Sequence, residues 1–310
     1  MTLQQLFLFQ QIVQNDFNIS KAAELLNMSQ PGLSRQILTL EKELDTSLFV
    51  RNKNRLTSLT NVGDVVFQLS KDILNKIESI KRLGEENNFP DKGSLTIATT
   101  HTQAKYVLPK IIQQFSIKYP FVKLRILQGT PSDSSKMVAN GSADLSIATK
   151  PIEKISNLFF LKCYEIPRII MMPLGHPLNK IKNIDLHHLI NHPLITYDFD
   201  FISRSKILDV FFNANLNPNI VLNAIDADVI KTYVELGMGI AILPAIAYDQ
   251  KNDKNLRSRT ASHLFEPNLI YLGLRSNDFV SRHSLNFIEL FAPDININNI
   301  QKEIFQVESI

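Results

Sequence analysis

SQPGLSRQI, at residues 29–37, is the stretch that decides how the rest of the chain is interpreted. Ser29 belongs to the residue types that cap helices, and Pro31 would fall in the first helical turn, where a missing N–H costs little. Apolar side chains recur at helical spacing within and beyond the stretch: Leu33, Ile37, Leu40 and Leu44. A helix is therefore predicted to begin just after Ser29.

A shorter helix is predicted immediately before this one. Ser20 can cap residues 21–26, which present one apolar face, and Asn27-Met28 interrupts the pattern. Two short helices joined by a tight turn form a helix-turn-helix.

The second helix turns outward side chains that suit DNA: Gln30, Ser34, Arg35 and Thr39. Arginine can pair with guanine through two hydrogen bonds, glutamine can pair with adenine, and serine can hold a phosphate. No acidic residue lies between Leu25 and Leu40 to repel phosphate. The alternative is a solvated helical hairpin, because this geometry also occurs in proteins that do not bind DNA.

A small β-hairpin is predicted over residues 48–57. It carries Arg51, Lys53 and Arg55 and no negative charge, as expected of a wing that lies against a phosphate backbone.

These residues resemble the N-terminal domain of LysR-type transcriptional regulators, most closely at Ala22-Ala23, residues 29–31, Leu40-Glu41, Leu48-Phe49 and Leu56-Thr57. The resemblance implies a winged helix-turn-helix that binds double-stranded DNA, joined by a long helix to an effector-binding domain. It implies a regulator and no enzyme. The candidate DNA-binding residues are Ser20, Ser29, Gln30, Pro31, Ser34, Arg35, Thr39, Arg51, Lys53 and Arg55.

Length, net charge, cysteine content and hydropathy limit the possible classes of protein only broadly. A chain of 310 residues can hold several domains, and its net charge of +3 is too small to argue for nucleic acid by itself. The single cysteine, Cys163, cannot form an internal disulfide, which fits a reducing compartment. There is no apolar run long enough to span a membrane, and the N-terminus does not resemble a signal peptide. We expect a cytoplasmic protein without a membrane partner or a cofactor.

A long helix is predicted over residues 59–83. Its apolar stripe comprises Val62, Val66, Leu69, Ile73, Ile77 and Ile80. The stripe either packs on its own domain or pairs with a second copy. We expect a homodimer through this helix, as the resemblance also implies, with further assembly into a homotetramer. A polar hinge is predicted over residues 84–93.

Strands and helices alternate beyond the hinge, which predicts mostly parallel α/β sheets. The expected fold class is an α+β winged helix-turn-helix domain, a linker helix and a two-lobed α/β effector domain similar to periplasmic binding proteins. A strand at 269–274 and a helix at 281–290 are expected to return to the first sheet. The expected boundaries are 1–58 for the DNA-binding domain, 59–92 for linker and hinge, 93–162 with 266–300 for lobe one, and 163–265 for lobe two.

Residues 99–103, TTHTQ, lie where a predicted strand ends and a helix begins. Open α/β sheets bind ligands at that edge. Three hydroxyls and an amide can hold an oxyanion without a full positive charge. The alternative is a helix cap, which needs only one hydroxyl.

This region resembles the CysB/Cbl branch of LysR-type regulators, through residues 98–104, 128–131, 148–149 and 226–234. The resemblance implies control of sulfur assimilation and a sulfate-like or acetylserine-like small-molecule effector. Carried over by position, it places Thr100, Thr102, Gln103 and Thr149 in the effector cleft.

The facing segment departs from the branch pattern. The branch has TFGFTGRS where this chain has DFDFISRS at residues 198–205. Ile202 replaces a ligand-binding threonine, and Ser203 can supply a hydroxyl from the next position. Asp198 and Asp200 oppose a bare dianion. We therefore expect weak sulfate binding and a preference for an amine-bearing or larger sulfur metabolite.

Other functions are less well supported. His187, His188 and His192 could form a metal cluster, but they fit a polar helix end better, and Cys163 with His176 shows no activating arrangement. A LysR-type regulator of another pathway remains open. So does a ligand-binding or transport protein without DNA activity, which a DNA shift assay would separate.

Overall fold

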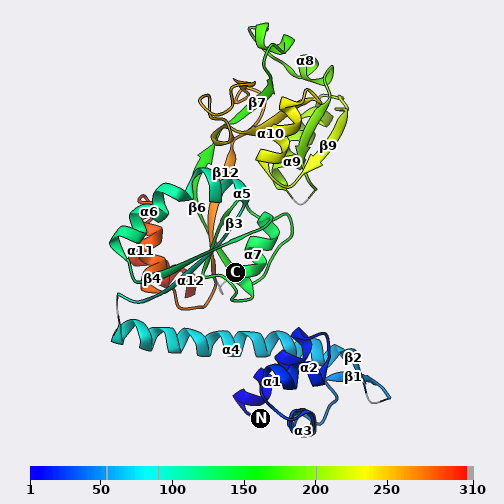
Figure 1. Cartoon of the computed structure of the whole chain (residues 1–310), viewed down its shortest axis with the longest axis vertical. Coiled ribbons are helices and arrows are strands. Elements are labelled where there is room, and N and C mark those ends of the chain that lie inside the picture. The colour runs from blue at the N-terminus through cyan, green and yellow to red at the C-terminus, as the bar shows by residue number, and fades with distance from the viewer. Residues whose placement is uncertain (54, 90, 200, 306–310) are drawn as a thin grey trace. The chain divides into compact units, whose positions relative to one another are not determined.

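The computed structural model describes residues 1–53, 55–89, 91–199 and 201–305. It divides into two compact units, Met1–Gly84 and Glu85–Ile310, which are described separately (Figure 1). Among the described residues, no helix is both long enough and apolar enough to span a membrane.

The first unit contains the predicted winged helix-turn-helix. Three helices, α1 (Leu3–Gln14), α2 (Ile19–Leu25) and α3 (Gln30–Glu43), precede the antiparallel hairpin of β1 (Phe49–Asn52) and β2 (Arg55–Leu59). Phe9 packs edge-to-face on Phe49 with ring centroids 5.2 Å apart, so the first helix and the wing share one core. Asn54, within the predicted wing, lies outside the described residues.

The predicted cap of α3 is confirmed and that of α2 is wrong. The Ser29 hydroxyl accepts the N–H of Gly32, and Pro31 lies in the first turn. The cap of α2 is instead Asn18, whose side chain accepts the N–H of Lys21. Asparagine caps helices as well as serine does, and Asn18 comes earlier, so Ser20 lies exposed within the first turn.

Helix α4 spans Asn61–Asn88 and is longer than predicted. The predicted hinge therefore begins too early, because Gly84 is helical. Glycine in a helix interior costs only about 1 kcal/mol relative to alanine, and good helix formers flank it. Pro90, within the predicted hinge, lies outside the described residues. In the isolated chain the helix exposes large apolar side chains: Val62, Val65, Leu69, Ile73, Ile80 and Leu83.

The second unit contains two five-stranded sheets. The order in the first is β4 (Val122–Gln128), β3 (Gly93–Thr99), β5 (Leu145–Ala148), β12 (Asn268–Arg275) and β6 (Leu158–Ile166). The order in the second is β11 (Leu256–Thr260), β7 (Arg168–Pro173), β10 (Ile240–Pro244), β8 (Leu194–Tyr197) and β9 (Ile220–Ala224).

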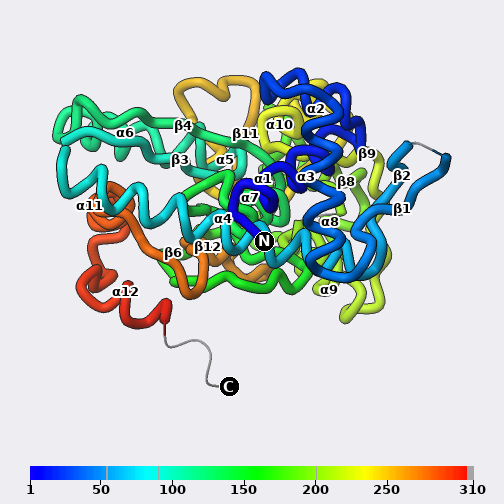
Figure 2. The backbone as a smooth tube through the Cα atoms, turned by 90° about the horizontal axis from the view of Figure 1, so that it is seen from below, coloured from blue at the N-terminus to red at the C-terminus, as the bar shows by residue number. Residues whose placement is uncertain are grey.

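Helices cover both faces of each sheet. On the first sheet, α6 (Leu108–Lys118) and α11 (Arg282–Phe291) pack on one face and α7 (Pro131–Ala139) on the other (Figure 1). The terminal helix α12 (Ile297–Phe305) lies beside α11 (Figure 2). On the second sheet, α10 (Ala227–Glu235) lies opposite α8 (Leu186–Ile190) and α9 (Ile202–Asn213). Short helix α5 (His101–Tyr106) follows β3, and 3-10 turns occur at Pro177–Lys180 and Ala245–Ala247.

The chain crosses between the sheets twice. It leaves the first sheet after β6 and enters the second at β7, with Pro167 between them, and returns between β11 and β12. The return of β12 to the first sheet is confirmed. The predicted lobe boundary after residue 162 falls inside β6, a strand that the sequence analysis did not predict.

The expectation of mostly parallel sheets is wrong. Strand β12 runs antiparallel to β5 and β6, and β7 runs antiparallel to β10 and β11. At each crossing the chain passes directly from a strand of one sheet to a strand of the other. A parallel pair needs a helical crossover within one sheet, and these strands lack it, so they pair antiparallel to their neighbours.

Candidate effector cleft and DNA-reading surface

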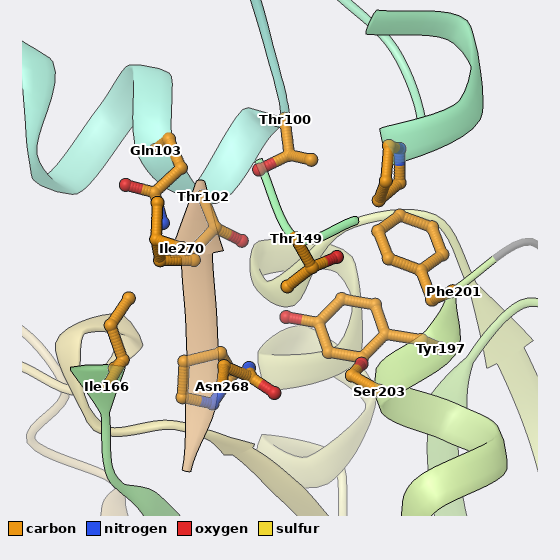
Figure 3. A pocket seen from close by; sticks show the side chains of 12 residues that line it. Thr100, Thr102, Gln103, Thr149, Ile166, Tyr197, Phe201, Ser203, Asn268 and Ile270 are labelled. Carbon is orange, nitrogen blue, oxygen red and sulfur yellow. The ribbon is translucent and has the colours of Figure 1, made fainter. Parts of the chain in front are cut away.

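A cleft of about 390 Å³, including space open to solvent, lies between the two sheets. Its walls include Ile166, Phe201 and Ile270. Seven polar side chains converge on this space (Figure 3): Thr100, Thr102, Gln103, Thr149, Tyr197, Ser203 and Asn268.

The hydroxyls of residues 99–103 have different surroundings. Thr99 is fully buried and donates to the carbonyl of Ile147 at 2.6 Å, so it ties β3 to β5 and does not face the cleft. Thr100 occupies the cap position of α5, but its side chain makes no capping hydrogen bond. Its hydroxyl is therefore not used as the helix cap that the sequence left as an alternative.

Gln103 is oriented by a residue that the sequence analysis missed. The hydroxyl of Tyr164, on β6, donates to Oε1 of Gln103 at 2.6 Å. Because this bond engages the amide oxygen, the amide nitrogen is left to donate. Gln103 is 2% exposed, so a ligand in the cleft can receive an N–H from a fixed, desolvated donor.

Tyr197 lines the cleft from the second lobe. Burial raises its pKa to about 12, and a hydrogen bond with Thr102 offsets part of that rise. The phenol is therefore neutral at physiological pH and retains a proton to donate. Its ring stacks on Phe201 at 4.9 Å, which fixes its position.

Two further polar side chains line the cleft, Ser203 from the second lobe and Asn268 from the first. Ser203 is buried in the first turn of α9, a helix without a side-chain cap, and Asn268 begins β12 where the chain returns to lobe one. Tyr197 could have been found from the sequence, because it ends the strand-like run at 193–197 and open α/β sheets bind ligands at that edge. Asn268 gave no local signal.

The described residues that line the cleft carry no formal charge. Asp198 is not among them, and its carboxylate accepts the N–H of Phe199 at 2.7 Å. Asp200 lies outside the described residues. Ile202 lines a neighbouring pocket instead of the cleft. Asp198 therefore does not line the cleft, where it was expected to repel a dianion.

Asp228 connects α10 of the second lobe to α5 of the first. It accepts hydrogen bonds from Lys105 at 2.7 Å and Tyr106 at 2.7 Å, and lies 2.8 Å from His101 Nε2. Burial tends to raise the pKa of Asp228, but these three bonds outweigh it and lower the pKa to about 2. A charged cluster therefore bridges the lobes beside the cleft.

The histidines considered as a metal cluster do not assemble into one. Within the described ranges, the one group with metal-ligand spacing is His101, Asp226 and Asp228, where the Lys105 ammonium already pairs with Asp228. His188 instead pairs with Asp185 in the first turn of α8.

On the DNA-reading surface, α3 exposes Gln30, Arg35 and Thr39, with Ser34 partly exposed. Gln30 donates to the Ser34 hydroxyl at 3.1 Å, and the Thr39 hydroxyl donates to the carbonyl of Arg35 at 2.9 Å. Across the described part of the chain, Arg35 has no ion pair.

The wing residues differ among themselves. Arg51 donates to Oε2 of Glu41 at 2.6 Å, and Oε1 of that carboxylate accepts the N–H groups of Leu48 and Phe49. Glu41 is buried, so Arg51 joins the wing to α3. Lys53 and Arg55 are exposed and, within the described chain, make no ion pair.

Comparisons with known proteins match both units. Residues 3–64 match the model for bacterial regulatory helix-turn-helix proteins of the lysR family, and residues 90–294 match that for the LysR substrate binding domain. The chain is 42% identical to the transcriptional regulator SsuR of Burkholderia cenocepacia over 96% of each chain, and 40% identical to CysB of that organism over 98% of this chain and 97% of CysB.

A solved structure supports the same assignment. The cofactor-binding domain of the Cbl transcriptional regulator is 35% identical and superposes with a TM-score of 0.66, over 69% of this chain and 94% of that one. The chain therefore belongs to the LysR family of bacterial transcriptional regulators, which are not enzymes.

Proposed function

We propose that this regulator controls genes of sulfur or cysteine metabolism and responds to a small oxyanion-bearing metabolite in the cleft. The observation that carries the proposal is the convergence of seven polar side chains, from both lobes, on a cleft whose described lining residues are uncharged. Neutral donors suit an oxyanion, because fixed hydrogen bonds in a desolvated site stabilise negative charge. Identity of about 40% to SsuR and CysB supports the pathway.

Thr100, Thr102, Gln103 and Thr149 form the first-lobe part of the proposed binding site, and Ser203 forms part of the second-lobe wall. Ile202 contributes only through the adjoining pocket. The donors Gln103 and Tyr197 are the best defined, since Tyr164 bonds the amide oxygen of Gln103 and the Tyr197 ring stacks on Phe201.

DNA binding in this proposal uses Ser29, Gln30, Pro31, Ser34 and Arg35 of the reading helix, with Thr39 at its outer face. Lys53 and Arg55 hold phosphate from the wing, while Arg51 supports the wing through Glu41. Ser20, exposed in the first turn of α2, is retained as a phosphate contact.

Dimerisation in this proposal uses α4. Most of its apolar stripe is exposed in a single chain, with Ile80 70% and Leu69 56% accessible, although Val66 packs on the core of its own unit. Exposed apolar surface of this kind favours a partner. The proposed division is a DNA-binding part at 1–58, a linker at 59–92 and an effector part at 93–310, with lobe one extended to the end of β6 at Ile166.

The test is calorimetry of the purified full-length protein with sulfate, acetylserine and related sulfur metabolites. Thr102→Val should lower the affinity for the preferred ligand by about tenfold, since a hydrogen bond to a charged group contributes roughly 1.5–3 kcal/mol. Thr232→Val is the matched control, because the Thr232 hydroxyl donates to the backbone carbonyl of Asp228 within its own helix. Unchanged binding by Thr102→Val would contradict the proposed site. Footprinting of the promoter beside the gene, with and without ligand, tests the pathway.

A further inference from the structure

A second pocket adjoins the cleft. It encloses about 400 Å³, including space open to solvent. Three of its lining side chains, Thr149, Ser203 and Asn268, also line the cleft. The two spaces therefore lie next to each other at these three side chains.

The two pockets differ in charge. Among the described residues, the cleft lining carries no charge, whereas the second pocket is lined by Lys150 and Lys206 and by no carboxylate. The Lys150 ammonium lies 4.7 Å from the ring centroid of Tyr271. Lys206 lies 3.2 Å from Glu266, whose side chain is 78% exposed, so solvent screens that pair strongly. Both ammonium groups can therefore accept a new anionic partner.

The lining of the second pocket is partly apolar. Ile202 lines the second pocket and not the cleft. A β-branched hydrocarbon at this position suits a short carbon chain better than a hydroxyl does. The departure of this chain from the CysB/Cbl pattern at residue 202 therefore lies in the second pocket.

We propose that the effector is two-ended, with an oxyanion head in the cleft and a second anionic group between Lys150 and Lys206. A short carbon chain over Ile202 joins the two ends. This inference rests on the proposed function, since it requires the cleft to hold the head. It differs from the amine-bearing effector expected from Asp198 and Asp200, because the charged side chains among the described residues that line the pocket are lysines.

Calorimetry with matched probes tests the inference on the full-length protein. The two-ended probes are sulfoacetate, sulfopropanoate and sulfobutanoate, and the one-ended controls are ethanesulfonate, propanesulfonate and butanesulfonate. At least one two-ended probe should bind tenfold or more tightly than its control. In the double variant Lys150→Met with Lys206→Met, that advantage should disappear while control affinities stay within twofold.

Two further variants sharpen the result. Lys162→Met removes a lysine that pairs with Glu165 on β6, outside both pockets, and should leave every affinity unchanged. Ile202→Glu should abolish the preference for the two-ended probe, because a carboxylate would face the second anionic group.

Each remaining outcome has a definite meaning. Equal affinities for two-ended and one-ended sulfonates in the wild type would overturn this inference and leave the proposed function intact. An equal loss of affinity for two-ended and one-ended probes in the lysine variant would also overturn the inference, since the lysines would then not contact the second anionic group specifically. Binding of acetylserine without binding of any sulfonate would overturn this inference alone. If the wild type binds no sulfonate, no sulfate and no acetylserine, the proposed function fails together with it.

Discussion

Arg35 and Arg51 are the same residue type in one basic region, yet their surroundings differ. Arg51 bonds a buried carboxylate, Glu41, and is held in place. Arg35 lies exposed on α3, where bases can reach it. Charge alone grouped Arg51 with Lys53 and Arg55 as phosphate contacts of the wing, because the carboxylate that Arg51 bonds comes from another element, α3.

Arg35→Ala should relax the choice of DNA sequence, with a loss of roughly 1–3 kcal/mol at one operator position, as expected for a bidentate contact with guanine. Lys53→Ala should weaken binding to all sequences alike and reduce the salt dependence. Competition binding with operator variants at several salt concentrations distinguishes the two. Equal sequence discrimination by wild type and Arg35→Ala would contradict the base-reading role.

Arg51→Ala should destabilise the first unit, by roughly 1–3 kcal/mol, because it removes the charged partner of a buried carboxylate. Chemical denaturation measures the loss. The matched control is Arg55→Ala, which removes an exposed charge from the same hairpin and should stay within about 0.5 kcal/mol of the wild type. Equal losses would mean that the Glu41 bond adds nothing to stability.

Helices were more predictable than strands at the scale of single elements. Asp226 caps α10 as its side-chain type predicts, accepting the N–H of Val229 at 2.8 Å. Strand β6 was missed because both of its faces are partly covered, so its residues do not alternate between apolar and polar. The end of α4 was missed because Gly84 breaks a pattern without breaking the helix.

Ile73→Asp should separate the dimer proposed for α4, since it places an unpaired charge against the partner helix at a cost of several kcal/mol. Sedimentation should then show smaller species and the DNA affinity should fall. Gln68→Asp is the control, because it adds the same charge off the apolar stripe of the same helix. An unchanged oligomer would mean that the stripe packs within its own subunit.

At the scale of the whole molecule, the cleft depends on the two crossings of the chain. Thr100, Thr102 and Gln103 could be located from the sequence because they share one short segment. Asn268 and Tyr164 could not, since they come from β12 and β6, strands that the crossings place beside α5. No local pattern encodes that proximity.

Asp228→Asn should weaken the contact between the lobes in a pH-dependent way. The folded pKa of Asp228 is lowered to about 2 from its ordinary 3.8, so its stabilisation is present above about pH 4 and is lost as the pH falls through 2. We expect a loss on the order of 1 kcal/mol at pH 6, which solvent screening keeps small. Denaturation between pH 6 and pH 2 should show the difference between the two proteins shrinking, with most of the change below pH 3. A constant difference would assign the effect to packing instead of charge.

The Glu41 carboxylate also determines how the recognition helix α3 can be exchanged between related proteins. One side chain at the end of α3 satisfies two N–H groups at the start of the wing and the guanidinium of Arg51. A chimera that imports a recognition helix without this carboxylate would leave two buried donors unpaired. The operator preference of one relative can therefore be transferred to another only by exchanging residues 29–59 as a whole, so that the recognition helix and the hairpin move together.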